Sequence, residues 1–305
     1  MSEALEISVV ICTYNRSAYI SDAMNSLYQQ TLARDRYEVI VVNNNSTDNT
    51  RQVCASFMQS HSDAQFYYYN EIQQGSSFAR NTGARHAASP LLCFMDDDAV
   101  ADTDYLERIV HFFEEHPNAG GLGGRIIPKY IPSKPEWMSH YVSSLVGHFH
   151  YSDAATIFAP NKYPLESNMI ICKKDFDEIG GFNTALPGVK GDLRIGGEGK
   201  DFFLRLKALG RTIYYDPEIR VQHVVETAKL TSEYLYRVAS GIGRGERVRM
   251  KEKGALAFSK KVAEYIFKLG ASFLLGIKYT LQGTPLKAGP VIRFRIDALK
   301  GLFNH

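Results

Sequence analysis

The sequence predicts an α/β fold in which a doubly wound, mostly parallel sheet with flanking helices is followed by a helical C-terminal extension. Two observations predict it. Apolar, strand-like runs alternate with segments of helical periodicity over residues 1–100, which is typical of parallel sheets covered by helices on both faces. Polar clusters follow three of these runs, at the strand ends where open α/β sheets bind ligands.

Each element of this first part has its own signal. Strands are expected where apolar residues run without interruption, and helices where they recur at a spacing of three or four. In chain order we expect a strand at Ile7–Cys12, a helix from Tyr19 to Tyr28, a strand at Tyr37–Val42, a helix capped by Ser46 or Asp48, a strand at Phe66–Tyr69, a helix starting at Ser76 and a strand at Leu91–Met95.

The middle of the chain is less regular. Pro128, Pro132 and Pro135 predict irregular structure or edge strands. Residues 180–199 hold seven glycines, which predicts a mobile loop. The other elements expected here are strands at Leu165–Cys172, Thr212–Tyr215 and Val221–Val224, and a helix at Lys200–Leu206 that ends near Gly210.

Composition and charge limit the possible functions. The chain has 305 residues, 45% hydrophobic and 22% charged, so it can bury a large core and is expected to be folded over most of its length. The net charge of +2 conceals an asymmetry, because residues 244–305 carry 13 Lys or Arg against 4 Asp or Glu, and the preceding part carries 22 against 29. We expect the basic tail to meet an anionic surface.

The N-terminus and the cysteines favour a cytoplasmic protein. Residues 1–6 have no basic region followed by an apolar stretch, so a secretory signal is not expected. Cys12, Cys54, Cys93 and Cys172 lie far apart without a CxxC pair. They are predicted to be reduced, and neither a disulfide frame nor a zinc site is indicated.

The segment Tyr265–Lys278 is apolar but interrupted by lysines. Its longest uncharged run, Leu269–Ile277, is far shorter than the roughly 20 residues that a membrane span needs. We expect a helix that lies on a membrane surface. The alternative is an amphipathic helix that packs on the domain itself or on a second subunit.

Three consecutive aspartates, Asp96, Asp97 and Asp98, follow the strand at Leu91–Met95. Adjacent carboxylates repel one another, which raises their pKa values unless a cation compensates the charge. Oxygen-rich clusters of this kind suit Mg²⁺ or Mn²⁺ bound together with phosphates. The alternative is a solvated acidic turn without a ligand.

Five short segments, spread over most of residues 7–245, together form a recognisable ordered set. They are the segments at 8–16, 41–48, 75–81 with Ala79-Arg80-Asn81, 94–98, and Gly180-Gly181-Phe182 with Gly196-Gly197-Glu198. In these segments and their order the chain resembles the inverting glycosyltransferases of family 2, which have the GT-A fold.

The resemblance implies a nucleotide-diphospho-sugar donor and a divalent cation, Mn²⁺ or Mg²⁺, as cofactor. Asp96 and Asp98 match the family's DxD positions, so Asp98 would bind the metal, Asp96 would contact the ribose or the metal, and Asp97 would be a supporting neighbour on the donor side. His223 matches a family histidine that completes the metal or diphosphate site. A core or surface histidine is the alternative.

Further residues match the donor pocket of the family. Arg80 would face the nucleotide or the diphosphate, where its guanidinium can donate two parallel hydrogen bonds. An exposed Arg80 on a helix surface is the alternative. The other residues implied on the donor side are Thr13, Tyr14, Asn15, Arg16, Asn43 and Asn45.

Two departures from the family pattern matter. Asn43 stands where the family usually has an aspartate that accepts a hydrogen bond from uracil, which leaves the base preference open. The catalytic motif lacks its second carboxylate, so Glu198 is the first candidate for the base that takes the acceptor's proton. Asp201 and Asp192 are the alternatives, and Asp201 could instead be an ordinary carboxylate in the first turn of a helix.

The expected organisation has three regions. Residues 1–100 would bind the nucleotide-sugar, 101–227 would bind the acceptor and carry the catalytic loop, and 228–305 would contact a membrane surface or form a homo-oligomer. We expect a metal-dependent, inverting transfer of a sugar, most simply from a UDP-sugar, to a hydroxyl of a glycan or lipid-linked acceptor. Such an enzyme would be cytoplasmic, peripheral on the inner face of the cell membrane, with no nucleic-acid partner.

Two other functions remain open at this level. A non-catalytic protein that binds nucleotide-sugars or acts as a scaffold would explain Asn43 and the missing carboxylate. A nucleotidyltransferase also uses acidic metal ligands, but the turn after Cys12 lacks the glycine-rich loop expected for a triphosphate. A dehydrogenase is disfavoured because that turn has no GxGxxG.

Overall fold

The computed structural model describes residues 4–190, 193–251 and 253–304. The chain divides into two compact units. Unit 1 comprises residues 1–127, 149–184 and 199–223, and unit 2 comprises residues 128–148, 185–198 and 224–305. The expected division into three functional regions stays a prediction.

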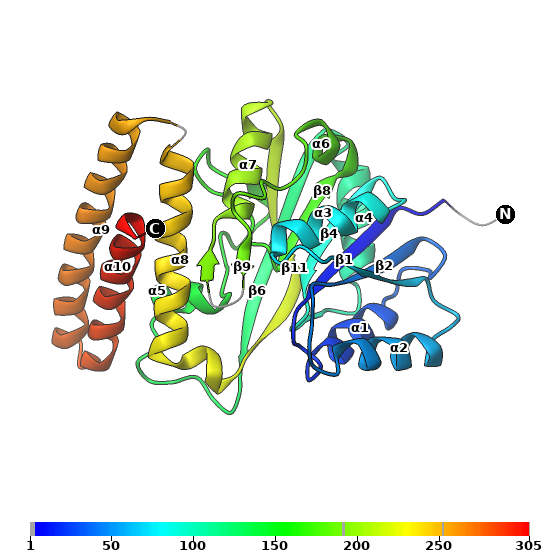
Figure 1. Ribbon diagram of the computed structural model, residues 1–305, viewed down its shortest axis with the longest axis horizontal. Helices are drawn as coiled ribbons and strands as arrows, with labels where there is room; N and C mark the ends of the chain where they lie inside the picture. Colours follow the sequence, from blue (N-terminus) through cyan, green and yellow to red (C-terminus); the bar gives the residue numbers. More distant parts are fainter. Residues whose placement is uncertain (1–3, 191–192, 252, 305) are drawn as a thin grey trace. The chain divides into compact units, whose positions relative to one another are not determined.

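Unit 1 contains the large sheet and its helices (Figure 1). The strands are β1 (Ile7–Thr13), β2 (Tyr37–Asn43), β3 (Phe66–Asn70), β4 (Leu91–Asp96), β5 (Ala99–Ala101), β6 (Ala119–Tyr130), β7 (Thr156–Ile157), β8 (Asn168–Cys172) and β11 (Thr212–Val225), of which β6 and β11 run on into unit 2. The helices are α1 (Ile20–Tyr28), α2 (Thr50–Ser60), α3 (Ser76–His86), α4 (Tyr105–Glu115), α6 (Lys173–Glu178) and α7 (Glu198–Ala208), whose first residue belongs to unit 2.

The sheet has the strand order β3-β2-β1-β4-β8-β6-β11-β5, with β7 paired to β11. The strands β3, β2, β1 and β4 are parallel, whereas β8 runs antiparallel to both β4 and β6, and β5 antiparallel to β11. The predicted α/β sheet with flanking helices is confirmed, and its parallel part is the first hundred residues whose alternation predicted it.

Strand β1 shows why both faces of the sheet are covered. Ile7, Val9 and Ile11 belong to a core cluster with α1, α2 and α4, whereas Val10 belongs to a second cluster with residues of α3, α6 and α7. Successive side chains of a strand point to opposite faces, so a continuous apolar run requires helices on both. The interior of β1 is essentially inaccessible to solvent, as expected for a central parallel strand.

The structure corrects several expected boundaries. β6 runs through Pro128 to Tyr130, so irregular structure starts later than the prolines suggested. The two short strands expected after residue 212 form one strand, β11. β8 starts at Asn168, three residues late, because Leu165 accepts a hydrogen bond from the Asn168 amide in a turn. α7 starts at Glu198 and not at Lys200.

Unit 2 is mostly helical, and Figure 1 shows its three long helices side by side. Its elements are α5 (His140–Ser143), β9 (Gly188–Lys190), β10 (Leu193–Ile195), α8 (Ser232–Lys251), α9 (Ala255–Leu281), α10 (Ala288–Phe303) and the short 3₁₀ turns η1 (Ser144–Val146), η2 (Thr227–Leu230) and η3 (Pro285–Lys287). α10 packs against α8 and α9 around a separate apolar cluster that includes Tyr265, Phe294 and Leu302.

Glycines allow the close helix packing in unit 2. A Cβ at Gly243 of α8 would lie 2.1 Å from the carbonyl oxygen of Ala298 in α10, and one at Gly301 would lie 2.0 Å from that of Ser240. The predicted helical extension is therefore confirmed. No helix within the described residues is both long and apolar enough to cross a membrane.

Candidate active site

The parallel strands bring the predicted donor residues to one edge of the sheet. Thr13, the last residue of β1, lies opposite Asn43, the last residue of β2, and Cys12 lies opposite Asp96 at the end of β4. Thr13 and Asn43 are buried, and Tyr14 directly beyond β1 is half-buried. The strand register alone therefore collects three of the polar clusters at the carboxyl edge, as the sequence predicted.

The loops after β1 and β2 are tied to each other through Asn15. Its φ is +54°, in the left-handed region that asparagine tolerates better than most residues. The Asn15 amide donates to Ser46 Oγ at 2.9 Å, and Asn15 Oδ1 accepts from the Thr47 amide at 2.7 Å. In this structure the Asn15 side chain holds a neighbouring loop, and its role toward a donor stays a prediction.

Asp48 makes the second link between these loops. Its two carboxylate oxygens accept from the backbone amides of Ser17, at 3.1 Å, and Thr50, at 3.0 Å. Partial burial raises the pKa of Asp48, but the hydrogen bonds from Thr50 and Ser17 outweigh it and bring the pKa to about 2. The carboxylate is thus stabilised in its charged form and fixes the start of α2.

The asparagines after β2 form a further part of this network. Asn43 Oδ1 accepts from the Ser46 amide at 3.1 Å, and Asn43 Nδ2 donates to Asn70 Oδ1 at 3.3 Å. Asn45, with φ of +65°, donates from its side chain to the Ile72 carbonyl at 2.6 Å. The side-chain amide of Asn43 therefore already uses both its oxygen and its nitrogen in hydrogen bonds. The second lone pair of the oxygen could still accept a hydrogen bond from a nucleobase.

The acidic cluster meets His223 because of the antiparallel pairing between β5 and β11. His223 lies opposite Ala99 in this pairing, directly after Asp98. His223 Nε2 lies 3.0 Å from Asp98 Oδ1 and 3.9 Å from Asp96 Oδ2. One ligand atom from each of these three residues lies within 4.8 Å of the others, so they could hold one metal ion.

Two arginines stand beside the carboxylates. Arg16 lies 3.6 Å from Asp98 and 3.8 Å from Asp97, and Arg80 of α3 lies 3.9 Å from Asp96. Arg80 is buried, with its guanidinium 5.6 Å from the centre of the Phe182 ring. This excludes the alternative of an exposed Arg80 on a helix surface.

The cluster also excludes the alternative of a solvated acidic turn. Asp97 and Asp98 are buried, and burial followed by the charge of Asp98 raises the pKa of Asp97 to about 8. Neighbouring carboxylates that share a buried site favour a cation between or beside them. Two carboxylates and one imidazole are ligand types that suit Mn²⁺, so these three side chains fit the predicted metal.

The predicted base, Glu198, is the first residue of α7 and is buried. The turn before it depends on Gly197, whose φ is +96°. The amide of the next residue, Gly199, donates to Glu166 Oε1 at 3.0 Å, which satisfies one free amide at the start of the helix. The Gly197 turn before Glu198 and the hydrogen bond of Gly199 after it thus fix the backbone on both sides of Glu198.

Asp201 and Asp192, the alternative candidates for the catalytic base, differ in what the structure describes of them. Asp201 Oδ2 accepts from Arg205 Nε at 2.8 Å, and Arg205 also donates to the carbonyls of Ile179 and Gly181. Asp201 therefore orients an arginine that holds the turn at residues 179–181. Asp192 lies outside the described residues.

Two further side chains at this edge were not predicted. Ser167 Oγ donates to Asp96 Oδ2, and Glu166 caps α7. Both precede β8, which pairs antiparallel with β4 and places Asn168 opposite Met95. The signal was the polar run Glu166-Ser167-Asn168 ahead of an apolar strand, but its meaning depends on knowing that β8 lies beside β4.

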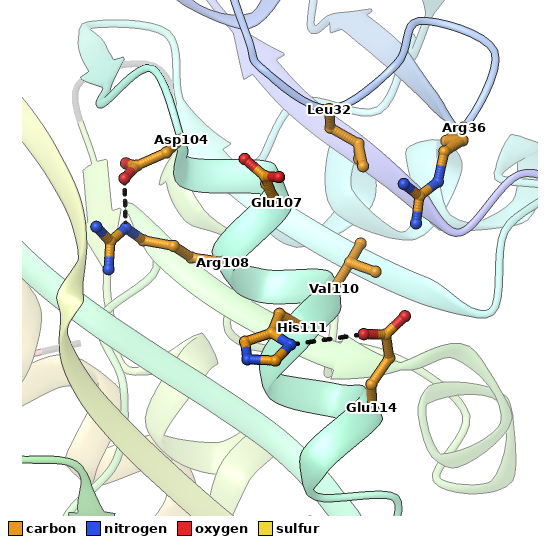
Figure 2. A pocket seen from close by; sticks show the side chains of 8 residues that line it. All are labelled: Leu32, Arg36, Asp104, Glu107, Arg108, Val110, His111 and Glu114. Atoms are coloured by element: carbon orange, nitrogen blue, oxygen red, sulfur yellow. Dashed lines mark hydrogen bonds and ion pairs between the residues drawn. The ribbon is translucent and has the colours of Figure 1, made fainter.

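A separate pocket on α4 has no connection to the predicted residues (Figure 2). Most of its polar side chains already have partners: Arg108 Nε lies 2.6 Å from Asp104 Oδ2, His111 Nδ1 lies 3.6 Å from Glu114 Oε2, and Arg36 pairs with Glu6 outside the pocket. The lining residues are Leu32, Arg36, Asp104, Glu107, Arg108, Val110, His111 and Glu114. Side chains that already have partners do not indicate a ligand.

The family of the chain follows from its sequence. The family model for glycosyl transferase family 2 matches residues 8–180, which is more than half of the chain. The chain belongs to glycosyl transferase family 2. The predicted family and enzyme class are confirmed, and the non-catalytic and nucleotidyltransferase alternatives lose their support.

This family 2 glycosyltransferase has relatives in archaea. It is 27% identical over 229 residues to a glucosyl-dolichyl phosphate glucuronosyltransferase of Haloferax volcanii, covering 72% of this chain and 69% of that protein. It is 35% identical over 102 residues to the glycosyltransferase AglE of the same organism, covering 33% of each protein. The match thus spans only a third of the second relative's length.

A solved structure shares the fold. The mannosyltransferase PcManGT from Pyrobaculum calidifontis, in complex with GDP-Man and Mn²⁺, superposes with a TM-score of 0.67 at 17% identity, covering 99% of this chain and 88% of that chain. Likeness at this identity concerns the fold alone. The predicted GT-A fold of the family 2 enzyme is confirmed.

Proposed function

We propose that the protein transfers a hexose from a nucleotide-diphospho-sugar to a hydroxyl of a glycan or lipid-linked acceptor, with inversion at the anomeric carbon. The observation that carries the proposal is the cluster of Asp96, Asp98 and His223 at the carboxyl edge of the sheet, with Arg16 and Arg80 beside it. Breaking the bond to the diphosphate builds negative charge on the leaving group, and this edge offers the groups that can compensate it.

A divalent cation held by Asp96, Asp98 and His223 would supply that compensation, with Mn²⁺ favoured over Mg²⁺ because imidazole is among its ligands. Arg80 is buried beside Asp96 and can donate to the phosphate oxygens through its planar guanidinium. Asp97, Thr13 and Tyr14 would line the nucleotide side of the same edge.

The reaction is a direct displacement. The acceptor oxygen forms a bond to the anomeric carbon from the side opposite the diphosphate, and the bond to the diphosphate breaks with its electron pair. Glu198 takes the proton of the acceptor hydroxyl, a role that suits a buried carboxylate at the end of a glycine turn. Asp201 ranks second as a candidate for this base, because its carboxylate already accepts a hydrogen bond from Arg205.

The nucleobase of the donor would be recognised by Asn43 at the end of β2. A UDP-sugar remains the first candidate by resemblance, and a GDP-sugar is the alternative, which the ligand of the Pyrobaculum calidifontis mannosyltransferase supports. Asn43 can accept from either base only through the free lone pair of its oxygen, since its amide already bonds to Ser46 and Asn70.

Transfer and donor hydrolysis with Mn²⁺, over a panel of UDP- and GDP-hexoses, test this function. Glu198→Gln should lower the rate by about 10²–10⁴-fold, the usual contribution of a general base. Asp201→Asn is the matched control and should change the rate only a few-fold. If the wild type and Glu198→Gln are equally inactive toward every donor, the proposed transferase function is refuted. If only Asp201→Asn loses activity, Asp201 and not Glu198 is the catalytic base.

We also propose that α9 binds the surface of a membrane from the cytoplasmic side, which would bring a lipid-linked acceptor to the enzyme. Its outer face is apolar and uncovered: Phe267 is 77% exposed, Leu274 70% and Leu281 83%. These residues recur at a spacing of seven, and exposed Lys260 and Lys278 border them. The basic charge of residues 244–305 is complementary to anionic lipid. A homo-oligomer through this face is the alternative.

Cosedimentation with vesicles that contain phosphatidylserine tests the membrane proposal. The wild type should sediment with the vesicles, and the double variant Phe267→Glu, Leu274→Glu should stay in the supernatant. Ile72→Glu, at an exposed apolar residue of unit 1, is the control and should sediment like the wild type. If the wild type does not sediment with the vesicles but elutes as a dimer, the result would favour a homo-oligomer formed through this face.

A further inference from the structure

We propose that Arg194, Arg237 and Arg244 form a second anion site, which binds a phosphate group carried by the acceptor. All three residues belong to unit 2. The inference rests on the proposed function, because it adds that the acceptor is phosphorylated, and the site is distinct from the cation cluster at the sheet edge.

The three arginines are brought together by one face of α8. Arg237 and Arg244 are seven residues apart, which places them on the same side of the helix two turns apart. Gly241 lies between them on that side, and Arg194 of β10 packs onto it: a Cβ at Gly241 would lie 2.9 Å from Arg194 Cγ. The side chain of Arg194 therefore starts between those of the other two.

No acidic partner of these arginines lies among the residues that the structure describes. Within the described part of the chain, none of them forms an ion pair, and the Nε atoms of Arg237 and Arg244 are buried without an acceptor. Arg244 Nη1 reaches only the Arg194 carbonyl and Ser240 Oγ, each at 3.4 Å. A buried donor without a partner has lost its hydrogen bonds to water without replacing them, so the arrangement favours an acceptor that binds there.

Other arginines of unit 2 show that this is a local property. Arg249 Nη1 lies 2.9 Å from Glu246 Oε1, and Arg293 Nε lies 3.6 Å from Asp297 Oδ2. Arg247 donates to the carbonyls of Leu302 and Phe303 at the end of α10. These three arginines of the helices thus have acidic or carbonyl partners, whereas the Nε atoms of Arg237 and Arg244 on the face toward β10 have none among the described residues, as is also true of Arg295 in α10.

That face also supports the catalytic loop. The Gly196 amide donates to the Gly241 carbonyl at 3.1 Å, and a Cβ at Gly245 would lie 1.7 Å from the Gly196 carbonyl oxygen. Glu198 follows two residues later. An anion held by the arginines would therefore bind beside the segment that carries the proposed base, where an acceptor must lie.

The chemistry of the site selects a phosphate. Guanidinium groups bind phosphate oxygens through paired, charge-assisted hydrogen bonds, and three of them match a dianion better than a single carboxylate. The donor's diphosphate has its own groups in unit 1, so the phosphate would come from the acceptor or from solution. A phosphate ester on an isoprenoid chain and free inorganic phosphate share this chemistry, and the experiment separates them.

Calorimetric titration with geranyl phosphate, inorganic phosphate and geraniol, in the presence of Mn²⁺ and a saturating nucleoside diphosphate, tests the site. Geranyl phosphate should bind the wild type, and the double variant Arg237→Gln, Arg244→Gln should bind it at least tenfold more weakly. Arg293→Gln, which removes the same charge from an exposed position of α10, should bind like the wild type. Geraniol should bind neither protein measurably.

The outcomes are decisive in both directions. Binding of inorganic phosphate as tight as that of geranyl phosphate, with the same dependence on the arginines, would keep the anion site but overturn its assignment to the acceptor. Equal binding of geranyl phosphate by wild type and double variant would overturn the site. Nucleotide binding in the same samples reports on the donor site separately, so failure of the arginine site and failure of the transferase function are distinguishable.

Discussion

The sheet edge in unit 1 and the inner face of α8 in unit 2 are both rich in charge, but they use it in opposite ways. At the sheet edge, the Asp98 carboxylate has the His223 imidazole within 3.0 Å and the Arg16 guanidinium within 3.6 Å, so it lies beside partners of its own. On α8, Arg237 and Arg244 stand without a carboxylate among the described residues. The first arrangement is compensated, and we propose that it exchanges these partners for a cation and a diphosphate. The second lacks an acidic partner among the described residues, and we propose that it binds an anion.

The two regions are also held together differently. Hydrogen bonds from side chains to backbone tie the loops of unit 1, as between Asn15 and Thr47. In unit 2, glycines allow one backbone to lie directly on another, as Gly245 does on Gly196. From this difference we expect the proposed donor side to tolerate changes of a single polar group, whereas the loop that carries the proposed base should tolerate no added volume.

Among the substitutions that probe this comparison, the largest effect is expected from Gly245→Ala. The added Cβ would lie 1.7 Å from the Gly196 carbonyl oxygen, so the loop that carries Glu198 must move. We expect kcat to fall roughly tenfold or more, while the affinity for the nucleoside diphosphate stays unchanged, because overpacking of this kind costs about 1–3 kcal/mol.

Gly270→Ala in α9 is the matched control for this substitution, because nothing lies within 4 Å of its Cβ position. This variant should keep full activity and gain roughly 1 kcal/mol of stability, since alanine replaces glycine inside a helix. Full activity of Gly245→Ala would show that the packing of α8 on the loop does not matter for catalysis.

His223→Gln is expected to have the next largest effect. It removes the imidazole that lies 3.0 Å from Asp98 and should weaken Mn²⁺ binding roughly tenfold, while Mg²⁺, which prefers oxygen ligands, should lose less. The apparent metal affinities from activity titrations with the two ions measure this. Equal losses for Mn²⁺ and Mg²⁺ would place His223 outside the ligand set.

The smallest expected effect concerns the loop network. The folded pKa of Asp48 is about 2, below its ordinary value of 3.8, so its contribution to stability is fully present above about pH 4 and is lost as the pH falls from 4 toward 2. Asp48→Asn should flatten the decline of the unfolding midpoint in this window. An unchanged pH profile would mean that its hydrogen bonds to Ser17 and Thr50 do not stabilise the fold.

The sequence predicted the parallel half well for a physical reason. Strand β1 is apolar on both faces and ends in polar residues, so residues such as Thr13 and Asp96 could be assigned to one edge from local patterns alone. The antiparallel half could not be predicted in this way, because the meeting of His223 with Asp98 depends on β5 pairing with β11 over more than a hundred residues.

The residues of unit 2 were even less predictable. The role of Gly241 and Gly245 follows only from the close approach of β10 to α8, and an alternating run of small residues in a helix does not reveal what packs on it. The unpaired state of Arg237 depends likewise on the absence of a carboxylate among the described residues around it, which is a property of tertiary structure.

The central claim is that Asp98 holds a divalent cation together with the donor's diphosphate. Titration calorimetry of UDP and GDP with and without Mn²⁺ tests it most directly, in the wild type, in Asp98→Asn and in Asp104→Asn, an acidic residue of unit 1 that pairs with Arg108 instead. We predict that Mn²⁺ strengthens nucleotide binding at least tenfold in the wild type and in Asp104→Asn, and not in Asp98→Asn. The same strengthening in Asp98→Asn would contradict the account.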